Sequence, residues 1–418
     1  MKVKNWFGMN TFLGGSLYTH NWPPENLLNE AKVKRFFVGC EYTSSTANVF
    51  SLFRSIGGWG WEESLAEFKA LGNTTVVSIL GGFTYQTMDG SIGARMPINI
   101  DADPYDPASY YTVARLCYNI AARWGTNTSA VVNDAELVAG SLPAQKGLGY
   151  CDYLEILNEW DNFWSGSSVE FDAESYAVCL HTCYTAIKDA DPNMKVLVGA
   201  LYQPDITLYN DVKAEWVAKG YGAFPSDIWF NYHRYLHNGL YEGKTHGEKP
   251  EMPVYGVFNQ VQTMDALNIP WCITEYGWDS SQLSAQSTPI VKELDGITDM
   301  STEKSKGVMI VRAALGYALS SNCKMCVFFH VRNDTNGGEG WLYATSGVYY
   351  RDSGIYYPLE ALDPILEFLD EVGECELPAT LVSSKSPYKV VFKNTDLNKQ
   401  IICTWTENGP VQYSECSL

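Results

Sequence analysis

The chain has 418 residues and carries 29 Lys and Arg against 48 Asp and Glu, which gives a formal net charge of −19. A chain that is 46% hydrophobic and 18% charged can bury a large core and is not disordered. The acidic balance repels phosphate backbones and excludes nucleic-acid binding as a main role, and the longest apolar runs, such as Cys326–Phe329, are too short for membrane insertion.

Eight short apolar runs, each typical of a strand buried on both faces, alternate with longer helical patterns. The predicted strands are Trp6–Asn10, Arg35–Cys40, Thr75–Leu80, Tyr153–Leu157, Lys195–Ala200, Ile228–His233, Trp271–Glu275 and Met325–His330. The predicted helices are Glu62–Leu71, Pro107–Trp124, Ala173–Ala190, Val254–Leu267, Thr302–Ser320 and Pro358–Val372. The links after the first and fifth strands are long enough for a helix, although their periodicity is vague.

This alternation predicts a (β/α)8 barrel, a TIM barrel of the α/β class, over residues 1–373. An open doubly wound sheet would favour a glycine-rich turn leading into a helix after the first strand, whereas Gly14-Gly15 is followed by Ser-Leu-Tyr-Thr-His. Residues 374–418 are too few for an independent sandwich, so we expect a β-rich segment packed on the barrel. Its strand-like runs are Ala379–Val382, Tyr388–Phe392 and Ile401–Trp405.

The 11 cysteines are mostly embedded in apolar segments and are interpreted as small core residues rather than a disulfide framework. Cys323 and Cys326 have the spacing of a zinc or redox pair but lack a second pair. The N-terminus leads directly into a strand-like segment with no charged-then-apolar export signal. We therefore expect either that a signal was removed or that the protein folds in a reducing cytosol, as a phage-encoded protein would.

Two predicted strands end in a glutamate within an aromatic setting. One reads Tyr153-Leu-Glu-Ile-Leu-Asn158-Glu159-Trp160, and the other reads Trp271-Cys-Ile-Thr-Glu275-Tyr-Gly-Trp278. Side chains at the carboxyl ends of barrel strands point into the active-site mouth, so these two carboxylates could face each other across a substrate. Glycoside hydrolysis needs such a pair, one protonated to donate to the leaving oxygen and one ionised to attack the anomeric carbon. The alternative, that each glutamate caps or pairs at its strand end, is less favoured for both together than for either alone.

Two further strands carry residues that could support these carboxylates. His233 and Tyr235 lie at the end of the sixth predicted strand, where a tyrosine hydroxyl could hydrogen-bond the carboxylate of the neighbouring strand and keep it ionised. Arg35, near the start of the second strand, could supply positive charge to the same carboxylate. A salt bridge at the base of the barrel is an equally good interpretation of Arg35.

The Asn158-Glu159 and Ile-Thr-Glu275-Tyr-Gly endings resemble those of clan A retaining glycoside hydrolases, the (β/α)8 superfamily that includes families 5, 30 and 39. The resemblance covers most of the chain, and the Asn-Glu-Trp-Asp stretch is most similar to glycosidases of gut Bacteroidetes. It implies that Glu159 is the acid/base and Glu275 the nucleophile. It also implies that Asn158 holds the substrate 2-hydroxyl and that His233 and Tyr235 line the cleft beside the nucleophile.

The eighth strand departs from the clan pattern, because many members carry a tryptophan there as a floor for the reacting sugar. Here the strand ends with Phe329-His330-Val-Arg332, so Phe329 or His330 would have to serve. Arg332 and Arg234 could recognise a uronate or sulfate through bidentate hydrogen bonds, or could form ordinary salt bridges.

The aromatic content, 13 Trp, 27 Tyr and 17 Phe, exceeds the needs of a core and favours sugar faces as partners. Four tryptophans follow predicted strands on the expected functional face. Each could stack on a sugar as part of a subsite, or pack its own loop. They are Trp160, Trp164, Trp278 and Trp341.

These observations together predict a retaining β-glycosidase that binds a poly- or oligosaccharide and needs no cofactor. A non-catalytic carbohydrate-binding or phage-borne glycan-recognition protein on the same barrel is the alternative. It would keep the aromatic residues and lose a carboxylate. A metal-dependent barrel hydrolase is disfavoured, because the 6 histidines include no H-x-H pair at the end of the first strand. The sugar, the linkage, endo or exo action and the oligomeric state stay open.

Overall fold

The computed structural model describes most of the chain. The described residues are 1–11, 30–43, 49–52, 60–81, 96–99, 101–133, 136–137, 145–161, 171–236, 239–241, 244–246, 249–251, 256–281, 283–288, 302–333, 343–352, 355–407 and 409–418.

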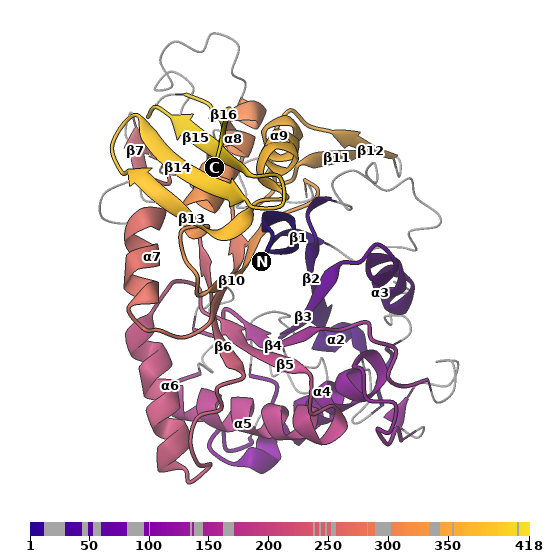
Figure 1. Cartoon of the computed structure of the whole chain (residues 1–418). Helices are drawn as coiled ribbons and strands as arrows, with labels where there is room; N and C mark the ends of the chain where they lie inside the picture. The colour runs from indigo at the N-terminus through magenta and orange to yellow at the C-terminus, as the bar shows by residue number, and fades with distance from the viewer. Residues whose placement is uncertain are drawn as a thin grey trace. The chain divides into compact units, whose positions relative to one another are not determined.

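Eight parallel strands form a closed barrel in the order β1-β10-β9-β6-β5-β4-β3-β2 (Figure 1). The predicted (β/α)8 class and all eight predicted strands are therefore confirmed, with strand ends that differ from the prediction by at most two residues. The strands are β1 (Phe7–Thr11), β2 (Val33–Gly39), β3 (Thr74–Leu80), β4 (Tyr153–Asn158), β5 (Lys195–Ala200), β6 (Ile228–Arg234), β9 (Trp271–Tyr276) and β10 (Cys323–Phe328).

The apolar runs form strands of this kind because both faces of each strand are covered. Every residue of β1 and of β9 is buried. The register is continuous along β4 and β5, from Tyr153 opposite Lys195 to Asn158 opposite Ala200. The carboxyl ends of these two strands therefore finish level with each other.

The chain divides into two compact units. The first unit contains Met1–Thr11, the described residues up to Lys34, and Arg234–Leu418. The second unit contains the described residues of Arg35–His233. Strands β1, β9 and β10 belong to the first unit, and β3, β4 and β5 belong to the second.

In the second unit, helices lie outside the strands, and α5 packs against both α4 and α6 (Figure 1). Aspartates begin three of its helical segments, as expected for residues that accept from free backbone N–H groups: Asp106 accepts from Ala108, Asp172 from Ser175 and Asp205 from Leu208. The helices are α2 (Cys40–Thr43), α3 (Trp61–Ala70), the 3₁₀ turn η3 (Pro107–Tyr110), α4 (Tyr111–Trp124), α5 (Ala173–Ala190) and α6 (Ile206–Ala218).

In the first unit, α8 (Thr302–Tyr317) is buried on all sides from Ser305 to Tyr317. A helix buried all round needs cover on more than one face. Here α7 (Val257–Asp265) and α9 (Leu362–Val372) pack against it. The remaining elements of this unit are the 3₁₀ turn η1 (Val3–Asn5) and two hairpins, β7 (Gly239–Tyr241) with β8 (Lys244–His246) and β11 (Tyr349–Asp352) with β12 (Ile355–Pro358).

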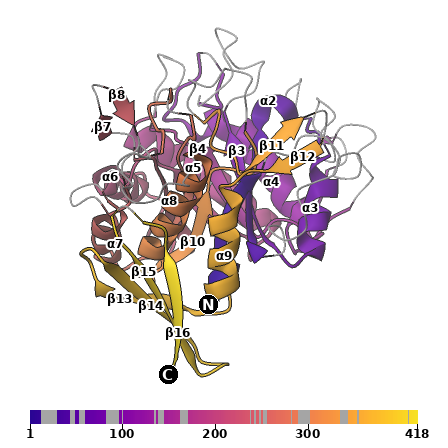
Figure 2. The ribbon, with the colours of Figure 1, turned by 90° about the horizontal axis from the view of Figure 1, so that it is seen from above.

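A four-stranded antiparallel sheet closes the first unit, beside α7, α8 and α9 (Figure 2). The Phe258 ring of α7 stacks on Tyr388 and Trp405 of this sheet. The sheet is therefore packed on the barrel part of its unit, and the predicted domain boundary at 373 stays a prediction. Its strands are β13 (Glu376–Ser383), β14 (Tyr388–Asn394), β15 (Lys399–Trp405) and β16 (Gln412–Ser417).

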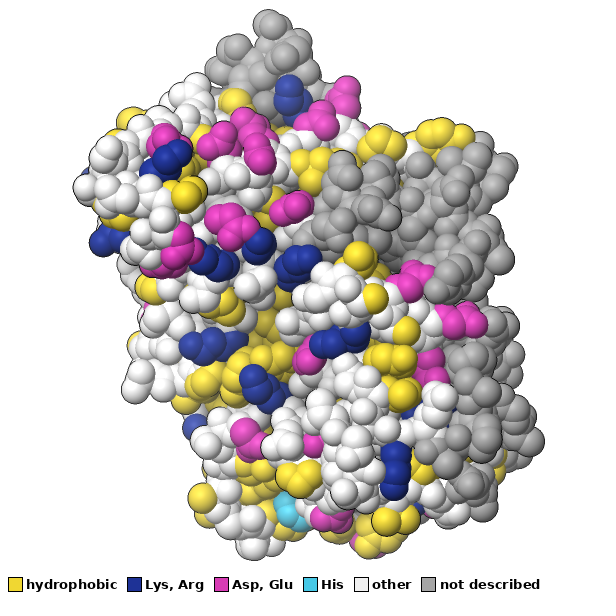
Figure 3. All heavy atoms as spheres, turned by 45° about the vertical axis from the view of Figure 1, so that its right-hand side comes forward, with side chains coloured by type: hydrophobic (Ala, Val, Ile, Leu, Met, Phe, Trp, Pro, Cys, Tyr) yellow, Lys and Arg dark blue, Asp and Glu magenta, His cyan; other side chains and the backbone are white. Residues whose placement is uncertain are grey.

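All 11 cysteines are free thiols, and all except Cys416 are buried, so the interpretation as core residues is confirmed. Acidic and basic side chains both occur over the described part of the face in Figure 3, interspersed with apolar atoms. Among the described helices, none has the length and apolar character needed to cross a bilayer.

A buried ion pair ties α8 to the C-terminal sheet. The Arg312 guanidinium donates to both Glu251 oxygens at 2.7 Å, and the Trp405 indole N–H donates to the same carboxylate at 2.8 Å. We predict that Arg312→Met, which leaves this carboxylate buried without its cation, lowers the free energy of unfolding by about 3–5 kcal/mol.

The matched control is Glu415→Gln, which breaks the exposed Lys399–Glu415 pair on the same sheet and should change stability by less than about 1 kcal/mol. Denaturant-induced unfolding measures both. Equal effects of the two substitutions would contradict the structural role given to Arg312.

Candidate active site

The carboxyl end of β4 carries Glu159 on an unusual stretch of backbone. Leu157 and Glu159 both have positive φ angles, 72° and 45°, in the left-handed region that side chains other than glycine rarely adopt. The Glu159 N–H donates to the carbonyl oxygen of Ala200, the last residue of β5, at 2.7 Å. Strained backbone of this kind collects at functional sites, where the surrounding structure enforces it.

Tyr176 of α5 enforces the end of β4. Its hydroxyl donates to the Ile156 carbonyl at 2.9 Å and accepts from the Gly199 N–H at 2.6 Å, so it bridges β4 and β5. A side chain on Gly199 would place its Cβ 2.1 Å from the Ile156 oxygen, so only glycine fits there. The Trp160 ring stacks on Tyr176 at 3.8 Å and its indole N–H donates to Gly199. Trp160 is 3% exposed, which favours the loop-packing interpretation over a sugar platform.

Glu159 is paired with His233. The Glu159 Oε1 and the His233 Nδ1 are 2.6 Å apart, and the two residues are 3% and 0% exposed. The structure gives His233 this contact with the expected acid/base, and its expected place beside the nucleophile stays a prediction. The pair therefore shares a hydrogen bond in a site shielded from water.

Arg35 is also fully buried, and it donates hydrogen bonds to Ser78 of β3 and to two residues of β4. It donates to both Glu155 oxygens, at 2.9 and 2.6 Å, and to the Asn158 Oδ1 at 2.7 Å. Because the Asn158 oxygen accepts this bond, the amide turns its NH2 group away from Arg35. The expected contact of Arg35 with Glu275, which belongs to the other unit, stays a prediction.

Glu275 lies at the carboxyl end of β9 in the first unit. The Tyr235 hydroxyl donates to the Glu275 Oε2 at 2.7 Å, which is the bond expected from the sequence. Glu275 is 5% exposed and Tyr235 is 3% exposed, so water competes little for this carboxylate. This hydrogen bond fixes the orientation of the carboxylate.

Aromatic rings surround Tyr235. The rings of Phe329 and Tyr343 approach it edge-on, with centroid distances of 6.4 and 4.9 Å. His330 is buried, and burial lowers its pKa to about 3, so its imidazole is neutral at ordinary pH. A Cβ on Gly277, just after β9, would lie 2.6 Å from the Phe329 oxygen. Glycine at this position therefore lets the ends of the two strands approach closely.

The other predicted site residues lie away from these contacts or outside the described residues. Trp278 is 1% exposed and is therefore packed inside the fold rather than presented to a ligand. Arg234 is buried, with its positive charge near Tyr317 of α8, and Arg332 is half-buried. Trp164 and Trp341 lie outside the described residues.

Sequence reasoning missed Asp161, two residues beyond Glu159. Burial raises its pKa to about 7, and the neighbouring negative charges of Glu159 and Asp205 act in the same direction. The Tyr202 N–H donates to its carboxylate at 2.9 Å. An acidic residue after a strand gave no signal by itself, because its burial depends on the tertiary structure.

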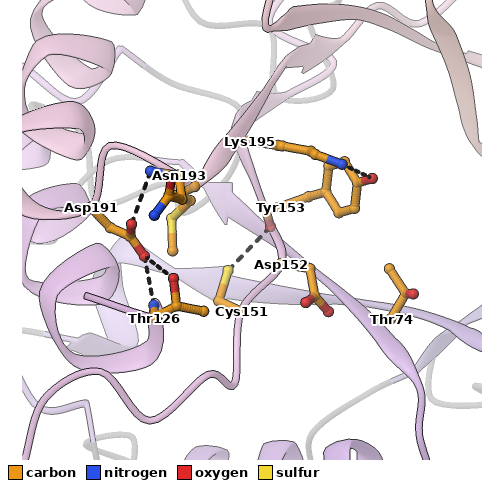
Figure 4. A pocket seen from close by; sticks show the side chains of 9 residues that line it. Thr74, Thr126, Cys151, Asp152, Tyr153, Asp191, Asn193 and Lys195 are labelled. Carbon is orange, nitrogen blue, oxygen red and sulfur yellow. Dashed lines mark hydrogen bonds between the residues drawn. The ribbon is translucent and has the colours of Figure 1, made fainter. Parts of the chain in front are cut away.

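A cavity of about 340 Å³ lies at the opposite, amino ends of β3, β4 and β5 (Figure 4). The Asp191 carboxylate accepts from the Thr126 and Asn193 N–H groups, and Lys195 donates to the Tyr153 hydroxyl. Residues at this end of a barrel generally serve stability rather than chemistry. The cavity is therefore a structural feature and not the candidate active site.

No protein-family model matches the sequence, and no curated protein matches it. Solved structures do. A family 39 glycoside hydrolase from the gut symbiont Bacteroides cellulosilyticus aligns over 100% of this chain and 71% of its own, with a TM-score of 0.55 and 9% identity. The catalytic domain of a GH30 xylanase from Talaromyces cellulolyticus aligns over 96% and 83%, with a TM-score of 0.54 and 11% identity.

A family 51 α-L-arabinofuranosidase from Bifidobacterium longum aligns over 96% of this chain and 82% of its own, with a TM-score of 0.54 and 10% identity. At identities this low, the likeness shows the fold alone. That fold is a closed (β/α)8 barrel, so the fold implied by the sequence resemblance is confirmed.

Asp161 predicts a pH-dependent stability. Its folded-state pKa of about 7 lies above its ordinary value of 3.8, so the folded state holds the proton more tightly and loses stability as the pH rises between these values. We predict that Asp161→Asn raises the free energy of unfolding by roughly 1–3 kcal/mol at pH 8 and has little effect below pH 4.

Denaturant titrations at the two pH values measure this difference. The control Asp211→Asn, at an exposed position of α6, should behave alike at both. A stabilisation by Asp161→Asn that does not depend on pH would show that Asp161 is not held in the protonated form.

Proposed function

We propose that the protein is a retaining β-glycoside hydrolase that cleaves a poly- or oligosaccharide through a glycosyl-enzyme intermediate. One observation carries the proposal: two buried glutamates end parallel strands of a clan A-type barrel, and each has a different hydrogen-bond partner. Glu159 has His233, and Glu275 has Tyr235. Two carboxyl groups in different environments are the requirement of this chemistry, because one must hold a proton while the other is ionised.

Glu275 is the proposed nucleophile. Its Oε2 accepts a hydrogen bond from the Tyr235 hydroxyl, which holds the carboxylate in one orientation. In the first step, a Glu275 oxygen bonds to the anomeric carbon as the bond from that carbon to the leaving oxygen breaks. Tyr235 positions the carboxylate without itself reacting.

Glu159 is the proposed acid/base. In the first step it gives its proton to the leaving glycosidic oxygen, and in the second it takes a proton from water as that water attacks the anomeric carbon and releases Glu275. The contact with His233 orients Glu159 and can share the proton between steps. This arrangement needs no metal ion, because the two carboxylates and a water supply both steps.

Asn158 is the proposed partner of the sugar 2-hydroxyl. Arg35 occupies its Oδ1, so the amide offers its NH2 group as a donor to the sugar. Glu155, which holds Arg35 from the other side, fixes the orientation of the whole chain of contacts. A hydrogen bond to the 2-hydroxyl is one that strengthens in the transition state of glycoside hydrolysis.

The substrate class is proposed as a neutral saccharide with a β-linkage. The net charge of −19 disfavours a strongly anionic polymer. The structural neighbours have different named substrates, including xylan and an α-L-arabinofuranoside, so fold likeness by itself does not select the sugar.

The first prediction from this proposal concerns Glu275→Gln. The substitution is nearly isosteric and removes the nucleophile, so hydrolysis should fall by about 10³-fold or more while the fold is kept. The measurement is product formation by mass spectrometry across a broad panel of glycans. The control Glu415→Gln, on the exposed face of the C-terminal sheet, should cleave as the parent does.

Equal cleavage by the parent and Glu275→Gln would remove Glu275 from the mechanism. A parent that binds glycans and cleaves none would favour the alternative, a non-catalytic carbohydrate-binding protein.

The second prediction concerns Glu159→Gln. A missing acid matters least for a substrate whose leaving group needs no proton, so activity on a dinitrophenyl glycoside should survive better than activity on an oligosaccharide. Azide, which needs no general base, should restore turnover and yield a β-glycosyl azide, identified by proton NMR. An α-glycosyl azide from this substitution would contradict a retaining mechanism.

A further inference from the structure

Tyr343, which follows β10 in the chain, has a φ angle of 69°. A bulky side chain rarely adopts this left-handed conformation, and where it does the surrounding structure must enforce it. Glycine would adopt it without strain. Since glycine would form this turn at lower cost, the tyrosine side chain is expected to have a role of its own.

Asp279, a fully buried residue just after β9, enforces the conformation of Tyr343. Its carboxylate accepts from the Tyr343 N–H at 3.0 Å, the Thr345 N–H at 3.2 Å and the Ser346 hydroxyl at 2.6 Å. The Ser284 hydroxyl donates to the same carboxylate. One buried carboxylate therefore joins two loops that follow neighbouring strands.

Lys306 of α8 holds the same segment from the other side. Its buried ammonium group donates to the carbonyl oxygens of Thr345 at 2.8 Å and Gly347 at 2.6 Å. Buried charges with several hydrogen bonds give the segment a single conformation. The backbone of Tyr343 is thus held from both sides, which offsets its strain.

The Tyr343 ring packs against Tyr235 and Phe329, and Tyr235 is the hydrogen-bond partner of the expected nucleophile. The ring centroid of Tyr343 is 4.9 Å from that of Tyr235 and 5.3 Å from that of Phe329. Tyr235 in turn donates to Glu275 at 2.7 Å. Tyr235 and Phe329 are 3% and 8% exposed, whereas Tyr343 is only half-buried. Tyr343 therefore carries the accessible surface of this aromatic cluster.

We propose that Tyr343 is a binding residue for the sugar that Glu275 attacks, with its ring face against the CH-rich face of that sugar. Asp279 is the positioning residue that fixes the Tyr343 backbone. The inference deepens the proposed function and rests on it. The ligand class is a glycoside with an apolar CH face, since aromatic rings recognise that surface.

A purely structural role for Tyr343 makes a different prediction. If the ring only supports Tyr235 from behind, its removal would disturb the Tyr235–Glu275 hydrogen bond and lower kcat, with KM unchanged. If the ring contacts the sugar, its removal raises KM and leaves kcat much less affected. The two roles are separated by which kinetic constant moves.

The experiment compares Tyr343→Gly, which keeps the backbone conformation and removes the ring, with Tyr343→Phe, which keeps the ring. Asn398→Gly is the matched control, because Asn398 also has a positive φ, 54°, in the turn between β14 and β15. Each protein is assayed with a panel of 4-nitrophenyl β-glycosides. Binding of the corresponding methyl β-glycosides is measured by saturation-transfer NMR, and thermal unfolding checks the fold.

For the glycoside that the parent hydrolyses best, Tyr343→Gly should raise KM about tenfold or more and change kcat less than about threefold. The KM of Tyr343→Phe should lie within about threefold of that of the parent, and the KM of Asn398→Gly should equal that of the parent. Binding of the methyl glycoside should weaken in the same order.

A fall in kcat with unchanged KM, or no change in either constant, would overturn the inference. If the parent binds a methyl glycoside but hydrolyses nothing, the proposed function fails. The role of Tyr343 is then tested by whether Tyr343→Gly weakens binding of that glycoside and Tyr343→Phe does not. If the parent neither binds nor hydrolyses any glycoside of the panel, both proposals are overturned.

Discussion

Burying a carboxylate costs free energy unless hydrogen-bond donors or a positive charge replace the water it loses. Three buried glutamates meet that constraint in three ways. Glu155 receives the Arg35 guanidinium, Glu159 the His233 imidazole and Glu275 the Tyr235 hydroxyl. These different partners give the three carboxyl groups different surroundings, which the roles proposed for Glu159 and Glu275 require.

The barrel makes these environments possible because its strands end in backbone conformations that rigid neighbours enforce. At β4, Tyr176 and Gly199 hold a stretch in which Leu157 and Glu159 have positive φ angles. After β10, Asp279 does the same for Tyr343. In both places a buried polar group accepts or donates the backbone hydrogen bonds, and a functional candidate is the residue held under strain. Trp160 and Trp278 are buried and pack the interior beside these strand ends. They support the backbone there rather than present a surface to a ligand.

The strands could be predicted from the sequence because each is an unbroken apolar run, and the two glutamates because each ends such a run. Helix α6, in the link after the fifth predicted strand, had only a vague pattern because only Tyr209, Val212 and Trp216 of it are buried. Strand β16 was missed because nearly all of it is exposed. The sequence placed His233 and Tyr235 at the end of the sixth strand, but His233 contacts the expected acid/base and Tyr235 the expected nucleophile. Asp161 stands out because it is buried, and Tyr343 because its φ angle is positive. Neither burial nor a backbone angle can be read from the identity of a single residue.

The central claim is that Glu275 forms a covalent bond to the sugar. It can be tested with 2-deoxy-2-fluoroglycosyl fluorides of the gluco, galacto, manno and xylo series, which slow release of the intermediate enough for mass spectrometry of the intact protein. The account predicts a single glycosyl adduct, located by peptide mapping on Glu275 and absent from Glu275→Gln. An adduct on any other residue, or none with a sugar whose ordinary β-glycoside the protein hydrolyses, would contradict it.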